Sequence, residues 1–223
     1  MNKKQMKIQR EYELRFSETH EYRTGVWKIL CNNFLNKYIL PDQSVLDLGS
    51  GWGEFINNMN ATKKYAIDLN PESESRLNKD IHFFQQDAGQ DWILPADSMD
   101  VIFSSNFLEH LPSKDHVERA IIEAHRVLKC HGLIILLGPN IKYVKGAYWD
   151  FWDHHIPLTD ISLSEALNLH GFKIKLNLPR FLPYSMSTGI RPYLFFIKAY
   201  LKLPFLWYFF GKQFFIIGEK TGR

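Results

Sequence analysis

Three carboxylates in this chain occur at or just after three short apolar runs that are typical of buried β-strands. Asp47 lies in the run VLDL, Asp68 ends the run YAID, and Asp87 follows IHFFQQ. The carboxyl ends of parallel strands meet at one edge of a sheet, so these acids are expected to lie close together. An acid at the end of the second strand can accept hydrogen bonds from both hydroxyls of a ribose. The three acids therefore predict a nucleoside ligand with a positively charged tail.

Alternating glycines follow the first of these acids in the sequence DLGSGWGEF. Glycine tolerates positive φ and lets a ligand approach the main chain closely, so this loop is expected to wrap against a bound molecule. The loop residues are Gly49, Ser50, Gly51 and Gly53. A helix is expected to begin near Glu54, where free N–H groups would suit a carboxylate or phosphate. A dinucleotide fold would have glycine at that position, and Asp47 would repel a pyrophosphate.

The composition indicates one globular domain. The 223 residues are 45% hydrophobic and 23% charged, and the formal net charge of +3 is too small to argue for nucleic acid binding. Cys31 and Cys130 form no disulfide or metal pattern, and the start MNKKQMKIQREYELRF lacks the apolar segment of a signal peptide. These features predict a cytoplasmic protein.

Seven apolar runs separated by polar or helical segments predict an α/β fold with a mostly parallel sheet. The runs are 44–48, 65–69, 81–85, 100–105, 132–138, 172–178 and 213–220. We expect a single domain over residues 1–223. Its parts would be a helical lead-in (1–41), a cofactor-binding core (42–178), an inserted segment (179–212) and the last strand (213–220).

The inserted segment is longer than a usual connection in a compact α/β domain. It holds nine aromatic residues between Arg191 and Phe210, with Pro192 placed to open a helix and Pro204 placed to end or kink it. Nine aromatics exceed what one helix face can bury, so the segment is expected to form a lid over the acceptor site.

Membrane contact through residues 191–210 is a further expectation for this segment. In a continuous helix, Arg191, Lys198 and Lys202 would form one basic stripe on an otherwise apolar surface. The segment from Gly171 to Lys212 contains seven Lys or Arg and no Asp or Glu. The charges and prolines make a poor transmembrane span. Two alternatives stay open: peripheral contact with the inner face of the membrane, and a purely internal lid.

The ordered motifs resemble those of the class I S-adenosylmethionine-dependent methyltransferases over about residues 40–180. The motifs are VLDLGSGWGEF, AIDLNPE, QQDA, DVIFSSNFLEHL and EAHRVLKCHGLIILLGPN. The resemblance implies a Rossmann-like sheet of seven strands with an antiparallel last strand and helices on both faces. It also implies S-adenosylmethionine as the cofactor.

The resemblance assigns cofactor contacts to the residues that match these motifs. Asp47 and the glycine loop would hold the methionine part, and Asp68 would bind the ribose. The other implied contacts are Leu69 at the adenine face, Asp87 at the adenine amino group, Ala88 at the ring and Asn106 at the methyl end. Lead-in residues that could close over the cofactor are Tyr22, Arg23 and Trp27.

Three histidines are candidates for a general base if the acceptor is a hydroxyl. His110 follows the fourth strand, and His154 and His155 follow the fifth. Each has a structural alternative: His110 could brace the following helix, and one of the adjacent pair, with His155 matching a family stretch better, could fix its loop. No metal site is predicted, because an adjacent histidine pair has poor ligand spacing.

These features predict a methyltransferase that O-methylates a sugar, a glycan or a lipophilic small molecule. The stretch GPNIKYVKGAYWDFWDHHIPLT and the inserted segment resemble methyltransferases of bacterial cell-surface polysaccharide biosynthesis and lipid-linked glycans. Two alternatives stay open. One is an NAD-dependent oxidoreductase on a similar sheet, which Asp47 and Glu54 disfavour, and the other is a noncatalytic binding module that retains the fold.

Overall fold

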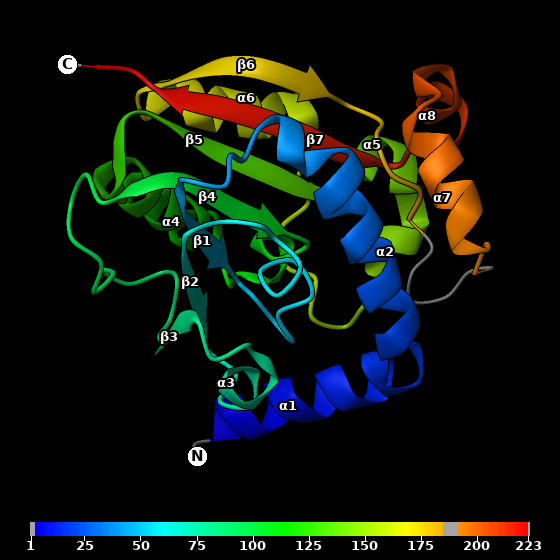
Figure 1. The fold of residues 1–223 in the computed structure, drawn as a ribbon, viewed down its shortest axis with the longest axis horizontal. Helices are drawn as coiled ribbons and strands as arrows, with labels where there is room; N and C mark the ends of the chain where they lie inside the picture. Colours follow the sequence, from blue (N-terminus) through cyan, green and yellow to red (C-terminus); the bar gives the residue numbers. More distant parts are fainter. Residues whose placement is uncertain (1–2, 185–190, 223) are drawn as a thin grey trace.

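The fold is that of a computed structural model, which describes residues 3–184 and 191–222. Seven strands form one sheet in the order β3-β2-β1-β4-β5-β7-β6 (Figure 1). β1 to β5 pair in parallel, whereas β7 runs antiparallel to both β5 and β6. The predicted seven-stranded, mostly parallel, Rossmann-like sheet is confirmed.

The strand boundaries follow the apolar runs of the sequence. They are β1 (Ser44–Leu48), β2 (Lys63–Asp68), β3 (Ile81–Gln85), β4 (Met99–Ser105), β5 (Leu128–Pro139), β6 (Phe172–Leu178) and β7 (Gln213–Lys220). β1 is buried along its whole length, as expected for a strand covered on both faces. β5 begins before its predicted start, because residues 129–132 continue the strand through an irregularity opposite β4.

Helices and short 3-10 turns connect and cover the strands. The helices are α1 (Lys3–Phe16), α2 (His20–Asn33), α3 (Ser73–Arg76), α4 (Lys114–Val127), α5 (Ile141–Val144), α6 (Asp160–Leu169), α7 (Leu194–Leu201) and α8 (Pro204–Phe210). The 3-10 turns are η1 (Ser17–Thr19), η2 (Leu35–Lys37), η3 (Leu108–His110) and η4 (Lys145–Asp150).

Two apolar cores pack against the sheet and include different helices. α4 and α6 contribute Ile121 and Leu163 to one core. α2 and the segment after it contribute Trp27 and Phe34 to the other, where Leu201 of α7 also packs. Apolar residues at helical spacing on α4 explain why this helix lies flat against strands. The prediction of helices on both faces is confirmed.

The first two helices, α1 and α2, lead from one side of the sheet toward the late helices α7 and α8. In Figure 1, α1 runs along the lower side beside α3, and α2 passes from its end up to α7 and α8. α7 begins at Leu194, so Arg191 lies outside the helix. The continuous basic stripe predicted from Arg191 is therefore wrong, because the segment is two short helices divided before Pro204.

The helix expected to begin near Glu54 is replaced, in the described residues 51–58, by successive turns. Asn58 donates from its side chain to the Glu54 carbonyl at 2.8 Å, and Asn57 donates to the Arg76 carbonyl at 2.9 Å. Asparagine side chains that bond nearby backbone compete with helix formation. That prediction was wrong, so the glycine loop presents its own N–H groups and not the N-terminus of a helix.

Candidate active site

A cavity of about 330 Å³ lies at the carboxyl ends of the parallel strands. Small-molecule sites commonly enclose about 300–1,000 Å³. The predicted residues that line it are Asp47, Gly49, Ser50, Gly51, Asp68, Leu69, Asp87, Ala88, Asn106, His110, His154 and His155, with Arg23 and Trp27 from the lead-in. Gly53 and Tyr22 are outside the lining. One cavity thus brings together nearly all of the predicted cofactor residues and all three candidate bases.

Aromatic side chains pack closely against the backbone of the glycine loop. Gly49 and Gly51 have φ values of 74° and 53°. A Cβ atom on Gly49 would lie 2.2 Å from the Phe107 ring, and one on Gly51 would lie 2.9 Å from the Tyr12 ring. Both positions therefore require glycine for backbone angle and for space.

Asp68 connects the end of β2 to this loop. One carboxylate oxygen accepts from the Gly51 N–H at 2.7 Å, and the other accepts from the Asn70 N–H at 2.8 Å. A carboxylate oxygen has two lone pairs, so each keeps capacity for a ribose hydroxyl. The Oγ of Ser50 is buried with no hydrogen-bond partner among the described residues, which leaves it available to a polar ligand.

Three buried carboxyl groups, those of Asp47, Glu54 and Asp68, are grouped at the base of the cavity. Burial raises the pKa of Asp47 well above its usual value, and the charges of Asp68 and Glu54 raise it further. Burial also raises the pKa of Asp68, although backbone N–H groups of Asn70 and Gly51 oppose the rise. A ligand with a positive charge near these acids would relieve their mutual repulsion. The donor set therefore fits a cationic nucleoside.

The lead-in residues divide between the cavity and the inserted segment. The Nε of Arg23 lies 3.1 Å from a carboxylate oxygen of Glu54, within the cavity wall. Tyr22 instead donates its hydroxyl to the Pro192 carbonyl at 2.9 Å, so it anchors the inserted segment to α2. Gly25 allows Leu194 of α7 to pack closely against α2, because a Cβ atom at position 25 would lie 2.8 Å from the Leu194 side chain.

The sequence prediction missed α1 as a wall of the cavity. Ile8, Glu11, Tyr12 and Arg15 all line it. Their spacing of three, four and seven residues from Ile8 places them on one helix face. That spacing was visible in the sequence, but the polar and charged residues in it resemble those of a solvated helix.

An ion-pair network lies at the acceptor end of the cavity. Asp153 binds Arg15 through hydrogen bonds of 2.9 and 2.5 Å, and its carboxylate lies 3.0 Å from Nδ1 of His110. Burial would raise the pKa of Asp153, but its bonds to His110 and Arg15 hold it far below its usual value. Burial would lower the pKa of His110, but Asp153 and Glu109 raise it. These contacts favour the protonated form of His110, which makes it less suited than a neutral imidazole to accept a proton.

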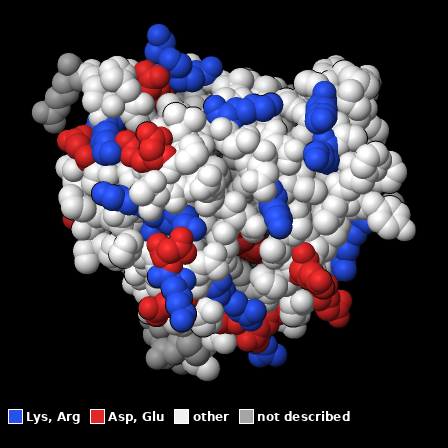
Figure 2. Space-filling model, in the orientation of Figure 1, with Lys and Arg blue, Asp and Glu red and all other residues white. Residues whose placement is uncertain are grey.

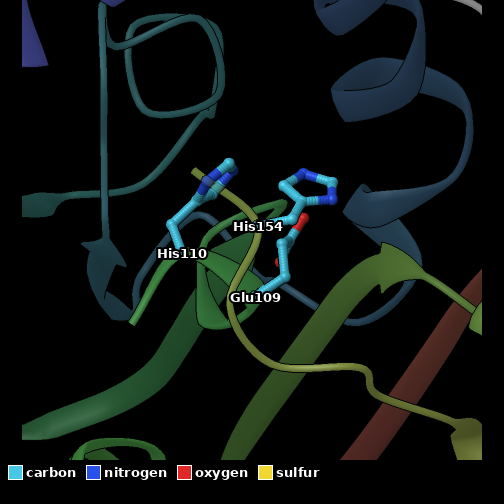
Figure 3. Close-up of side chains that lie close together, drawn as sticks. All are labelled: Glu109, His110 and His154. Carbon is cyan, nitrogen blue, oxygen red and sulfur yellow. The ribbon is translucent and has the colours of Figure 1, made fainter. Parts of the chain in front are cut away.

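His154 has the opposite character. Burial, together with the charge of His110, lowers its pKa to about 4. Its Nδ1 is buried with no hydrogen-bond partner among the described residues. Glu109 is only 2% exposed, and burial raises its pKa while the charge of His110 opposes the rise. Figure 3 shows the three side chains converging, with the Glu109 carboxylate next to the His154 ring.

The donor atoms of Glu109, His110 and His154 lie within 4.8 Å of one another, a grouping that could hold a metal ion. The sequence offered no such cluster, because its members come from two distant segments. His155 separates from this group: its side chain is exposed, and its N–H donates to the Glu109 carbonyl at 2.8 Å.

Aromatic rings surround the acceptor end. The Phe151 ring stacks on His154 with centroids 5.0 Å apart, and Tyr184 meets Phe151 edge-on at 5.8 Å. Trp149 and Trp152, which lie near Phe151 in the sequence, are 54% and 83% exposed and are not among the residues that line the cavity. Within residues 179–184 and 191–212, Tyr184 lines the cavity, whereas α7 and α8 do not. The prediction that this segment forms a lid is thus met among the described residues by Tyr184 and not by α7 or α8, and residues 185–190 of the segment lie outside the described residues.

Comparison with known proteins finds a family match over part of the chain. Residues 46–136, less than half of the chain, match the family described as "Methyltransferase domain". None of the curated proteins compared with the chain matches it. The family match and the fold support a class I S-adenosylmethionine-dependent methyltransferase, and they imply S-adenosylmethionine as the cofactor.

Solved structures show the same fold at low sequence identity. A SAM-dependent methyltransferase from Archaeoglobus fulgidus is 18% identical, with a TM-score of 0.68 over 92% of this chain and 99% of that one. A SAM-dependent methyltransferase from Thermotoga maritima, described as a possible histamine N-methyltransferase, is 18% identical, with a TM-score of 0.65 over 95% and 99%. The [4+2]-cyclase SpnF is 19% identical, with a TM-score of 0.58 over 85% and 79%. Because a cyclase shares the fold, the fold alone does not decide the acceptor or the reaction.

Proposed function

We propose that this protein transfers the methyl group of S-adenosylmethionine to a hydroxyl oxygen of a sugar, a glycan or a lipophilic small molecule. The observation that carries the proposal is one cavity with two chemically different ends. Buried acids at one end suit a cation, and a buried, neutral imidazole stands at the other.

At the cofactor end, Asp47 and Asp68 supply negative charge, and the loop after β1 supplies backbone N–H groups. S-adenosylmethionine, when bound, supplies an electrophilic methyl group on a positively charged sulfur. Asp68 is placed to accept from ribose hydroxyls while it holds Gly51. These residues bind and orient the cofactor and need not change it chemically, because methyl transfer depends mainly on positioning and exclusion of water.

At the acceptor end, His154 would accept the proton of a hydroxyl. Its Nδ1 lone pair has no partner among the described residues, and the ring lines the cavity. Glu109 beside it would stabilise the imidazolium once the proton has moved, as a carboxylate does in other histidine pairs. The bound cofactor would supply its methyl group to the acceptor oxygen, and His154 would take the proton that this oxygen loses.

The proposed acceptor class rests on the surroundings of this end. Trp149 and Trp152 expose their indoles in the segment that carries Phe151, and aromatic faces can stack on sugar rings. Phe151 and Tyr184 give the cavity an apolar side that also suits a lipophilic acceptor. The resemblance to enzymes of lipid-linked glycans agrees with both features.

The experiment is a screen of candidate acceptors with cofactor labelled in its methyl group. Product is partitioned between water and an organic solvent, and label in a glycan or lipid-linked glycan supports the proposal. Label only in nitrogen or carbon positions of other acceptors would contradict it. A fluorescence titration with NADH tests the oxidoreductase alternative, which predicts binding that Asp47 should prevent.

A further inference from the structure

α7 and α8 present an apolar aromatic face to the outside of the molecule. Seven aromatic side chains between Tyr193 and Phe210 are more than half exposed, among them Phe195 at 72%, Phe205 at 61% and Phe209 at 65%. We call the exposed aromatic side chains of residues 193–196 and 205–210 the aromatic surface. Contiguous apolar surface of this kind is rare on a monomeric protein without a partner.

The opposite faces of the same helices are firmly attached to the domain. Leu201 is 5% exposed within the core formed with α2. The Tyr200 hydroxyl donates to the Phe181 carbonyl at 2.6 Å, and the Trp207 indole N–H donates to the Tyr200 carbonyl at 3.0 Å. These contacts fix the orientation of both helices, and this orientation turns the aromatic surface outward.

The charged side chains of the segment that carries the aromatic surface are all basic. Lys198, Lys202 and Lys212 are exposed, and within the described part of the chain none of them forms an ion pair. No Asp or Glu occurs from Gly171 to Lys212. Figure 2 shows uncharged surface with basic groups, and no acidic ones, over α7 and α8.

This charge pattern selects among possible occupants. In a symmetric dimer, a second copy would bring the same patch, with the same unpaired lysines, against Lys198 and Lys202. An anionic lipid bilayer instead supplies phosphates for the lysines and an apolar layer for the rings. α7 has 8 residues and α8 has 7, too few to span a bilayer, for which about 20 are needed. Among the described helices, none has the length and apolar character that crossing a membrane requires.

We propose that α7 and α8 dock this protein onto the surface of an anionic lipid bilayer. The rings of the aromatic surface enter the interface between headgroups and acyl chains, and Lys198 and Lys202 lie at the lipid phosphates. Docking requires neither cofactor nor acceptor. Its test can therefore fail while methyl transfer stands, and methyl transfer can fail while docking stands.

The test is flotation of the full chain with two kinds of vesicle, one of phosphatidylcholine alone and one that also contains phosphatidylglycerol. Wild-type protein is expected to float with the anionic vesicles, and high salt should weaken this binding because it screens the lysines. Two double variants, Phe205→Ser with Phe209→Ser, and Lys198→Glu with Lys202→Glu, are each expected to lower the bound fraction more than about tenfold.

The matched control is Leu169→Ser, which removes a side chain that is 77% exposed on α6, outside the aromatic surface. It should float like the wild type. Circular dichroism and cofactor affinity show that each variant is folded. Wild-type protein that stays in the soluble fraction overturns the proposal. So does a dimer, detected by analytical ultracentrifugation, that Phe205→Ser with Phe209→Ser dissociates while vesicle binding is absent.

Discussion

The guanidinium of Arg15 and the carboxylate of Asp153 form a pair of hydrogen bonds, at 2.9 and 2.5 Å, across 138 residues of sequence. The pair joins α1 to the loop that carries His154, and both segments line the cavity. Asp153 also lies 3.0 Å from Nδ1 of His110, so the same carboxylate orients the ring beneath the acceptor end. The first helix of the chain is therefore part of the site.

Arg15→Ala should lower the free energy of unfolding by about 2 kcal/mol, because hydrogen bonds to charged groups contribute about 1.5–3 kcal/mol. Arg10→Ala removes an exposed arginine from the same helix and should change the stability little. Urea denaturation measures both. Equal stabilities for the two variants would show that the pair does not hold α1 to the domain.

Asp47→Asn should make the ligand-free protein more stable at neutral pH while weakening S-adenosylmethionine binding. The pKa of Asp47 is higher in the folded protein than in the unfolded chain, so its ionisation destabilises the fold as pH rises through the folded pKa. Asparagine removes that charge and keeps an acceptor for the Ile56 N–H. Thermal denaturation against pH and calorimetry check the two effects.

The control for this variant is Asp42→Asn, which neutralises an exposed acid near the start of β1. It should leave both the melting temperature and the cofactor affinity unchanged. If Asp47→Asn destabilises the protein, or binds cofactor as tightly as the wild type, the buried negative charge is not a cation site.

His154→Gln should reduce kcat by about 100-fold or more, the usual range for loss of a general base, with cofactor affinity nearly unchanged. A base must be unprotonated, so the rate should fall on the acid side only as pH approaches the His154 pKa of about 4. His155→Gln, on the exposed neighbour, should retain most of the rate. Steady-state kinetics against pH measure both variants. If His155→Gln is slower than His154→Gln, the general base is His155 and not His154.

Treatment with EDTA should leave methyl transfer unchanged. Nδ1 of His110 is occupied by Asp153, and the raised pKa of that histidine opposes metal binding. The measurement compares initial rates before and after chelation, followed by addition of Mn²⁺ or Zn²⁺. Loss of activity that either ion restores would make Glu109, His110 and His154 a metal site instead of a proton-transfer group.

The sheet and the cofactor end were predictable because their signals are local. β1, β3, β6 and β7 have the predicted boundaries, since buried strands appear as short apolar runs. Asp47 and Asp68 meet in one cavity because parallel strands end at one edge. Those placements follow from chain order and strand direction alone.

The acceptor end was only partly predictable because it is assembled from distant segments. No local pattern indicates that Arg15 reaches Asp153, or that Tyr22 anchors Pro192 instead of covering the cofactor. The helix expected near Glu54 was wrong because asparagine side chains bond the local backbone there. Nothing in the spacing of His154 and His155 shows that one is buried and the other exposed.

The most direct test of the account is calorimetric titration of the intact protein with S-adenosylmethionine. Wild-type protein should bind it, and Asp68→Ala should weaken binding at least about tenfold, equivalent to about 1.4 kcal/mol. Asp91→Ala, which removes an acid with an 82% exposed side chain, should bind like the wild type. Absence of binding by the folded wild-type protein, or equal affinity in Asp68→Ala, would contradict the claim that these buried acids hold a cationic nucleoside.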